Sequence, residues 1–305
     1  MNKHSSDVVQ KIRLKKLSEQ VIEKLLAFSG LVTVLTTIGI IWVLVSESWG
    51  FFANVPLTKF LFDTEWTPLF TNKRYGILPL LTGTILTTFI AVATALPLGI
   101  IIAVYLSEYA NKSFRRKVKP ALEILAAVPT VVYGFFALTV VTPFLQSFIP
   151  GVGSFNALSA GLVMGIMIVP LISSLSEDAL YAVPKSLREA SYGMGATKFQ
   201  TAFKVVVPAA SSGIIVSIIL AVSRAIGETM VVAIAAGQQP KLTFDPRESV
   251  ETITTYIVQV SLGDVQHDSM EYKTIFAAGI TLFVFTFLLN NLSYWIRKKY
   301  QERYE

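Results

Sequence analysis

The chain has 305 residues, of which 53% are hydrophobic and only 15% charged, and it contains no cysteine. Soluble domains carry roughly a quarter charged residues, so this composition excludes an ordinary soluble protein and indicates a membrane protein. The absence of cysteine excludes disulfides and thiol chemistry. The net charge of +6 is accounted for by basic loops between membrane spans, and does not indicate a nucleic-acid-binding surface.

Six apolar runs are long enough to cross the hydrocarbon core of a membrane, which takes about 20 residues. They predict an all-α integral membrane protein with six transmembrane helices. The predicted spans are residues 25–45, 78–106, 122–149, 157–175, 206–236 and 275–296. Several contain proline, which a helical bundle tolerates because neighbouring groups can satisfy the freed carbonyls.

The spans divide the chain into four parts. Residues 1–24 interleave apolar and basic side chains, which predicts an amphipathic helix on the inner leaflet, with a frayed polar tail as the alternative. Residues 25–77 hold the first span, expected to be an uncleaved anchor, and an outer loop. Residues 78–296 form the transport core, and residues 297–305 form a second tail.

The distribution of lysine and arginine predicts the orientation. Because six spans return the chain to the side on which it started, both termini share one side. That side collects 19 of the 26 basic residues, and the opposite side holds six. Basic residues favour cytoplasmic loops. Both termini, residues 111–120 and the loop around Glu189 are therefore predicted to be cytoplasmic.

A polar segment separates the fourth and fifth spans. Pro184 can start a short helix at its first turn, where a missing N–H costs nothing. Glu189 and Ala190 would lie on that helix, and Gly193 and Gly195 would supply the tight turn that follows it. The chain is therefore predicted to fold back on itself within this loop.

Thr197 can then cap a second short helix, which carries Phe199 and Phe203 four residues apart on one apolar face. Two short helices bent at glycines form a compact knob suited to a groove in another protein. Residues 184–208 resemble the EAA loop of ABC importer permeases, by which a membrane subunit docks into a separate ATPase. Ser191 stands where that pattern has its second alanine, and both residues are small. An ordinary amphipathic loop helix is the alternative interpretation.

The predicted fifth span contains a charged pair. Arg224 is the only basic residue within any predicted span, and it lies roughly 24 Å from Pro208 at about 1.5 Å per residue. Burying an arginine there costs on the order of 3 kcal/mol. Glu228 follows four residues later, one helical turn away on the same face. The pair should therefore face the bundle interior or a water-filled path.

Two interpretations of this pair stay open. In one, Arg224 and Glu228 form a buried salt bridge between helices, which adds little net stability. In the other, the planar guanidinium of Arg224 binds a tetrahedral oxyanion through two parallel hydrogen bonds. Glu228 would then accept a hydrogen bond from a ligand that still carries an O–H. Phosphate carries such a proton at neutral pH, whereas sulfate does not.

Residues 237–274 form a long outer loop. Asp245, Pro246 and Glu248 predict the N-terminus of a helix there, with an N-cap, a proline at the first position and an acid at the third. One apolar stripe is predicted to follow, made of Val250, Ile253, Ile257 and Val260. This helix would either meet an extracytoplasmic partner or only cap the bundle.

Several motifs of enzymes are missing from the sequence. No Gly-x-x-x-x-Gly-Lys-Ser/Thr motif occurs, so no ATP binding through a P-loop is expected. His4 and His267 are the only histidines, and neither has a partner at the spacing of metal ligands. We therefore expect no catalytic residue, no cofactor and no metal in this chain.

The string Arg-Ala-Ile-Gly-Glu-Thr-Met at residues 224–230 resembles the signature of the membrane subunits of the high-affinity phosphate ABC importer, the Pst system. Residues 51–52, 66–70 and 251–254 are also similar to that family. The length of the chain and its extended first outer loop favour the PstC-like type of permease. The resemblance covers residues 25–296.

This resemblance implies a type I ABC importer permease core with a MetI-like fold, in a bacterial cytoplasmic (inner) membrane. It also implies a heterodimer with a paralogous permease, two ATP-binding subunits, an extracytoplasmic phosphate-binding protein and contact with lipid, but no nucleic acid. The implied phosphate pathway contains Arg224, Glu228 and Thr229. The implied ATPase-coupling residues are Glu189, Ala190, Gly193, Gly195, Thr197 and Phe199.

Three alternatives remain open. An ABC permease for another oxyanion, such as sulfate or molybdate, keeps the class, but Glu228 should repel a fully deprotonated dianion. An ion-coupled transporter or channel that works without ATP fits the topology and leaves the EAA-like loop without a purpose. A membrane sensor or assembly scaffold predicts that Arg224 is dispensable for uptake.

Overall fold

The computed structural model describes residues 3–267 and 269–300, and within these ranges every regular element is helical. The α-helices are α1 (Lys3–Phe52), α2 (Leu57–Phe62), α3 (Leu78–Val104), α4 (Lys112–Ala127), α5 (Thr130–Phe136), α6 (Thr142–Phe148), α7 (Ala157–Ala182), α8 (Lys185–Gly193), α9 (Lys198–Thr201), α10 (Val207–Ala209), α11 (Ser211–Ile226), α12 (Met230–Ala235), α13 (Ile253–Leu262) and α14 (Met270–Tyr300). Three π-helical turns continue α3, α5 and α9, namely η1 (Tyr105–Tyr109), η2 (Ala137–Val141) and η3 (Ala202–Val206). The predicted all-α class is confirmed.

The described residues contain five helices long and apolar enough to span a membrane, or six if one bent pair counts as a span. The bent pair joins Lys198–Ala209 to Ser211–Ile226 at an angle of 70°. The five single spans are Glu19–Phe52, Leu78–Tyr109, Thr130–Phe148, Ala157–Ala182 and Met270–Trp295. With the bent pair included, the number of spans agrees with the predicted six.

Two predicted spans have the wrong boundaries. The span predicted over 122–149 begins at Thr130, because α4 ends at Ala127 and Pro129 disfavours helical backbone at the residue before it. The span predicted over 206–236 is not one helix, since α11 ends at Ile226 and α12 starts at Met230. Apolar residues flank both breaks on each side, so the length of the apolar runs alone did not show them.

The centre of the bundle is the contact between α3 and α7. Gly161 and Gly165 lie one helical turn apart on α7, and a Cβ atom at either would fall within 3 Å of atoms of α3. Small residues four apart let two helices approach closely, which is a common way to pack helices inside a membrane. Buried side chains of α7, among them Met164 and Ile168, complete this core.

An aromatic cluster closes the end of the molecule that carries α2 and α13. Phe51, Phe60, Trp66 and Tyr256 are buried there. The rings of Trp66 and Tyr256 meet edge to face, with centroids 5.0 Å apart, a favoured geometry for aromatic pairs. The cluster therefore ties the end of α1, α2 and the first outer loop to α13.

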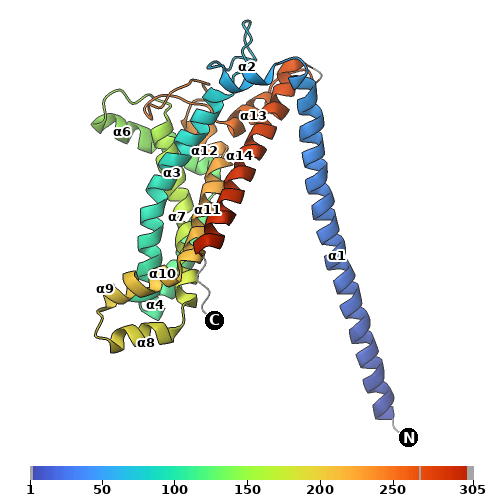
Figure 1. Ribbon diagram of the computed structural model, residues 1–305, viewed down its shortest axis with the longest axis vertical. Coiled ribbons are helices and arrows are strands. Elements are labelled where there is room, and N and C mark those ends of the chain that lie inside the picture. The colour runs from blue at the N-terminus through green and yellow to red at the C-terminus, as the bar shows by residue number, and fades with distance from the viewer. Residues whose placement is uncertain (1–2, 268, 301–305) are drawn as a thin grey trace.

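Helix α1 leaves the bundle and runs apart from it along most of its length (Figure 1). Its contacts with the rest of the chain are made mainly with α14, and its apolar side chains between Val21 and Val45 are exposed within this chain. The amphipathic faces predicted for residues 1–24 lie largely outside the described side chains, although the backbone from Lys3 onward is helical.

Candidate functional site

Helices α11 and α12 are separated by residues 227–229, here called the helix break. The side chain of Glu228 accepts hydrogen bonds from the amides of Met230 at 3.1 Å and Val231 at 3.3 Å. It therefore satisfies amides that the first turn of α12 leaves without intrahelical partners. Glu228 is buried, and its carboxylate is fixed by the backbone of the helix that follows it.

The predicted pairing of Arg224 with Glu228 on one helix face is wrong. Arg224 lies in the last turn of α11, and the chain leaves the helix at Gly227 before it reaches Glu228. Among the residues that the structure describes, Arg224 forms no ion pair, and it is exposed within this chain. The interpretation of the pair as an internal salt bridge is therefore excluded for this conformation.

Arg224 lines a cavity of about 230 Å³ between α4, α7 and α11, here called the Arg224 cavity. Its walls are formed by Leu122, Glu123, Ala126, Met167, Pro170, Leu171, Ser174 and Leu175 together with Arg224. Most of these side chains are apolar, so the guanidinium and the carboxylate of Glu123 are its two charged groups. A cavity of this size admits several water-sized groups. Arg224 thus provides this cavity with a cation that forms no ion pair in the described chain and is able to bind an anion.

The helix break is held against the outer loop by hydroxyl groups. The hydroxyl of Thr254 donates to the carbonyl of Glu228 at 2.9 Å, and the amide of Ile253 donates to the hydroxyl of Thr84 on α3 at 3.1 Å. The sequence prediction did not include these contacts. The sequence signal that could have predicted these contacts was the run Glu-Thr-Ile-Thr-Thr at residues 251–255, at the start of an apolar helix. Thr229, predicted to lie on the pathway, is partly buried within the break.

The predicted start of the outer helix is also wrong. Helix α13 begins at Ile253 and is capped by Thr252 in a capping box with Thr255. Val250 pairs with Gly237 in an isolated bridge and is not helical. Asp245 closes a local turn by accepting from the amide of Arg247, and its hydrogen bonds with Arg247 lower its pKa to about 2. The buried stripe itself is confirmed at Ile253 and Val260.

The EAA-like loop has the predicted fold except at Gly193, which is the last residue of α8 and does not lie in the turn. Helix α8 is followed by a turn at Gly195, whose φ of +82° is a backbone conformation that suits glycine. Thr197 then caps α9 in a capping box with Gln200. The rings of Phe199 and Phe203 lie 4.6 Å apart and are exposed. In Figure 1, α8 and α9 project from the end of the bundle opposite α2.

The base of this loop is fixed by buried polar contacts that the sequence prediction missed. Arg188 on α8 donates to the carbonyls of Leu180 and Val183 at 2.8 and 2.6 Å, and to the carboxylate of Glu108 at 2.8 Å. The hydroxyl of Ser191 lies 2.9 Å from that of Thr201. The exposed tip therefore stands on a rigid base, so that a displacement of α8 must be transmitted to α7 and η1.

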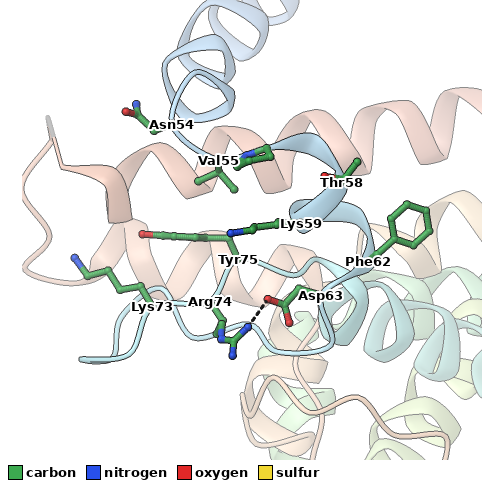
Figure 2. A pocket seen from close by; sticks show the side chains of 10 residues that line it. Asn54, Val55, Thr58, Lys59, Phe62, Asp63, Lys73, Arg74 and Tyr75 are labelled. Atoms are coloured by element: carbon green, nitrogen blue, oxygen red, sulfur yellow. Dashed lines mark hydrogen bonds and ion pairs between the residues drawn. The ribbon is translucent and has the colours of Figure 1, made fainter.

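A cavity of about 720 Å³ opens at the opposite end, beside α2 and the first outer loop (Figure 2). Two of its cations are paired, since Arg74 points toward Asp63 at 3.3 Å and Lys73 pairs with Glu271, whereas Lys59 forms no ion pair with a residue that the structure describes. We therefore assign no ligand to it. The described residues contain no group of three or more His, Cys, Asp or Glu side chains that could hold a metal ion.

Known structures share this fold. The chain superposes on a bacterial ABC transporter involved in the import of the acidic polysaccharide alginate with a TM-score of 0.59 and 16% identity, over 89% of this chain and 96% of that one. It superposes on the MetNI methionine ABC transporter with a TM-score of 0.55 and 20% identity, over 74% and 95% of the two chains. The predicted ABC importer permease fold is thus confirmed.

Curated relatives are closer in sequence. The probable ABC transporter permease protein YqgH of Bacillus subtilis is 36% identical over 75% of this chain and 74% of its own length. The phosphate transport system permease protein PstC of Xylella fastidiosa strain 9a5c is 34% identical over 75% of each chain, and PstC of Mesorhizobium japonicum is 33% identical over 76% and 75%. These relatives are transport subunits by name, and none is named as an enzyme.

A family model matches residues 95–302, which is more than half of the chain. That model describes multi-pass membrane components of transport systems that depend on a binding protein. The sequence resemblance, the fold and the relatives agree with it. The chain therefore belongs to the family of binding-protein-dependent transport system inner membrane components.

Proposed function

We propose that this chain is the permease subunit of an ATP-driven ABC importer that moves inorganic phosphate from an extracytoplasmic binding protein into the cytoplasm. The relatives named as phosphate transport system permeases support the cargo. The observation that carries the proposal is Arg224, a guanidinium without an ion pair in the described chain that lines a cavity between α4, α7 and α11. Such a planar cation matches a tetrahedral oxyanion.

Within this proposal the three pathway residues have different roles. Arg224 binds the anion. Glu228 caps α12 and thereby fixes the shape of the helix break. Its carboxylate positions the pathway residues and does not pair with Arg224. Thr229 lies next to Glu228 in the break and supplies a hydroxyl. Gly227, by ending α11, allows the anion ligand and the capping acid to face different surroundings.

The EAA-like loop is proposed to dock into the ATPase. Its exposed apolar tip consists of Tyr192, Met194, Phe199 and Phe203. Glu189 and Ala190 lie exposed on α8, Gly193 ends that helix, Gly195 lies in the turn, and Thr197 fixes the start of α9. An amphipathic helix that presents an apolar face is suited to a groove in another protein. Closure of the ATPases would move α8, and the contacts of Arg188 would pass that motion to α7.

The same proposal includes the partners and the topology. We propose a heterodimer with a paralogous permease, two ATP-binding subunits and lipid around the apolar helices. The core is residues 78–296, with the first helix and outer loop at 25–77 and tails at 1–24 and 297–305. We propose that both termini lie in the cytoplasm, on the side of α8 and α9. The start of α1 and the end of α14 run toward that side (Figure 1), and the basic residues favour it.

Uptake of radiolabelled phosphate into proteoliposomes that hold the complete complex, with ATP inside, tests the proposal. We expect Arg224→Gln to reduce uptake by roughly a hundredfold, because a charge-assisted contact in the pathway is lost, while the complex still assembles. Arg224→Lys should retain partial uptake, since it keeps the charge and loses the planar fork.

Two controls make the result specific to the cavity and to the cargo. Lys117→Gln removes an exposed cation outside the Arg224 cavity and should leave uptake unchanged. An excess of unlabelled sulfate should not compete with labelled phosphate. Normal uptake by Arg224→Gln would reject the role of Arg224, and competition by sulfate would reject phosphate as the selected cargo.

A further inference from the structure

One face of α4 carries four cations. Lys112, Arg115, Arg116 and Lys119 follow one another at helical spacings of three, one and three residues, so they share a single face. All four line a cleft of about 700 Å³ that is completed by η1 and by Tyr181 of α7, here called the basic cleft. This cleft lies outside the residues assigned to the pathway and to ATPase docking.

Two of these cations are held in place by acids of α7. Arg115 pairs with Glu177, and its guanidinium lies 4.0 Å from the centre of the Tyr181 ring. The Nζ atom of Lys119 lies 3.1 Å from Glu177 and 2.6 Å from Asp178. Burial acts to lower the pKa of Lys119, but its hydrogen bonds to these two acids raise it overall, so the side chain stays charged.

The other two cations are available to a ligand. Lys112 and Arg116 are exposed, and neither forms an ion pair with any residue that the structure describes. They lie one turn apart at the open side of the cleft. The basic cleft thus combines two cations held by ion pairs with two exposed cations that form none, and Glu123 is the acid among its lining residues.

The basic cleft adjoins the Arg224 cavity. Glu123 lies on α4 one turn beyond Lys119 and lines both spaces. Glu123 therefore lies between Arg224 and the unpaired cations near the end of the bundle that carries α8 and α9. In Figure 1, α4 lies at that same end.

Resting on the proposed function, we infer that the basic face of α4 is a second phosphate site, which receives the anion from Arg224 and releases it on the cytoplasmic side. Its ligand is a tetrahedral phosphate oxyanion. Two exposed cations bind such an anion weakly and reversibly, as an exit site requires. Glu123, at the junction, favours an anion that still carries an O–H, because its carboxylate can accept that proton in a hydrogen bond.

Two simpler reasons for a basic α4 account for less of its geometry. The positive-inside rule explains why α4 is basic, but it does not require the cations to share one face or to meet the cavity of the membrane arginine. An anionic lipid headgroup offers the same phosphate chemistry, and basic pockets on the cytoplasmic side bind such headgroups. The two sources of phosphate can be separated by experiment.

The test uses the complete complex with its binding protein in proteoliposomes, and compares wild type with the double variant Lys112→Gln/Arg116→Gln. Labelled phosphate uptake and ATP hydrolysis are measured together, in vesicles of zwitterionic lipid alone and in vesicles that also contain anionic lipid. Lys117→Gln is the matched control, because Lys117 is an exposed cation of α4 that does not line the cleft.

We expect the double variant to lower uptake roughly fivefold in both kinds of vesicle, with ATP hydrolysis unchanged, since each exposed cation contributes less than about a tenfold factor. A decrease confined to vesicles with anionic lipid would show a headgroup site and overturn the inference. So would unchanged uptake, or a parallel loss of ATP hydrolysis. A wild-type complex that carries no phosphate would overturn the proposed function itself.

Discussion

The two ends of the bundle are built differently. At the end with α2 and α13, Phe51, Trp66 and Tyr256 are almost fully buried, and threonine hydroxyls tie the outer loop to α3 and to the helix break. At the end with α8 and α9, Met194 is 83% and Phe199 63% exposed. Helix α4 at that end has no buried residue at all.

This difference indicates which end other proteins complete. The outer end buries its largest aromatic rings in one cluster and joins its outer loop to α3 and the helix break by hydrogen bonds. The opposite end leaves apolar rings and cations uncovered, although Arg188 and Ser191 hold its backbone rigidly. Exposed apolar groups on a rigid support are typical of a docking surface. Substitutions should therefore affect folding at the first end and assembly at the second.

The largest effect is expected from the same substitution made at two glycines. A Cβ atom at Gly83 would lie 2.2 Å from the backbone carbonyl oxygen of Glu251, a distance that forces the backbone to move. A Cβ atom at Gly193 meets nothing within 4 Å. We expect Gly83→Ala to destabilise the chain by about 3 kcal/mol or to prevent folding, and Gly193→Ala to leave stability nearly unchanged.

Thermal unfolding in detergent, together with the yield of folded protein, measures both variants. Equal behaviour of Gly83→Ala and Gly193→Ala would contradict the close seating of the outer loop on α3. A loss of stability at Gly193 alone would reverse the comparison between the two ends.

A smaller effect is expected from removing one exposed ring at each end. Phe199 and Phe244 are 63% and 76% exposed, the first on α9 and the second in the outer loop. Phe199→Ala should weaken association with the ATP-binding subunits by about thirtyfold, because aromatic anchors of an interface contribute about 2 kcal/mol. Phe244→Ala should leave this association unchanged, and neither variant should alter the melting temperature. Co-purification of the ATPase at graded salt and detergent measures the difference.

Much of this architecture could be predicted from the sequence. Length and apolarity of the runs predicted the helical bundle, and the turn chemistry of Gly195 and Thr197 predicted the fold of the EAA-like loop. Both signals are local, so they do not depend on tertiary contacts.

The site was harder to predict. Helical periodicity placed Arg224 and Glu228 on one face, but the chain breaks at Gly227, and a single glycine within an apolar run does not by itself indicate a helix end. The cap of α13 was placed at Asp245 because Asp-Pro-Arg-Glu fits a helix start. That stretch forms only a local turn, and residue 250 pairs with residue 237 in a bridge. Such long-range pairings leave no signal in a single sequence.

A pH-dependent effect is expected from Glu251, an acid buried in the outer loop. Its side chain is 1% exposed, and its Oε1 atom has no hydrogen-bond partner within the described structure. Burial raises its pKa from 4.5 to about 8. Between these two values the folded chain keeps a proton that the unfolded chain has lost. Stability from this group is therefore full below the unfolded pKa and decreases as the pH rises to about 8.

Glu251→Gln should remove this dependence, because glutamine resembles the protonated carboxyl in shape and cannot ionise. We expect the wild-type free energy of unfolding to fall between about pH 5 and pH 8, with a slope of at most ~1.4 kcal/mol per pH unit, and that of the variant to be nearly flat. Glu189→Gln, which changes an exposed acid on α8, should keep the wild-type slope. Melting temperatures measured across this pH range check both expectations. Parallel curves for wild type and Glu251→Gln would mean that water reaches this carboxyl, and the outer end would then be less closed than its packing indicates.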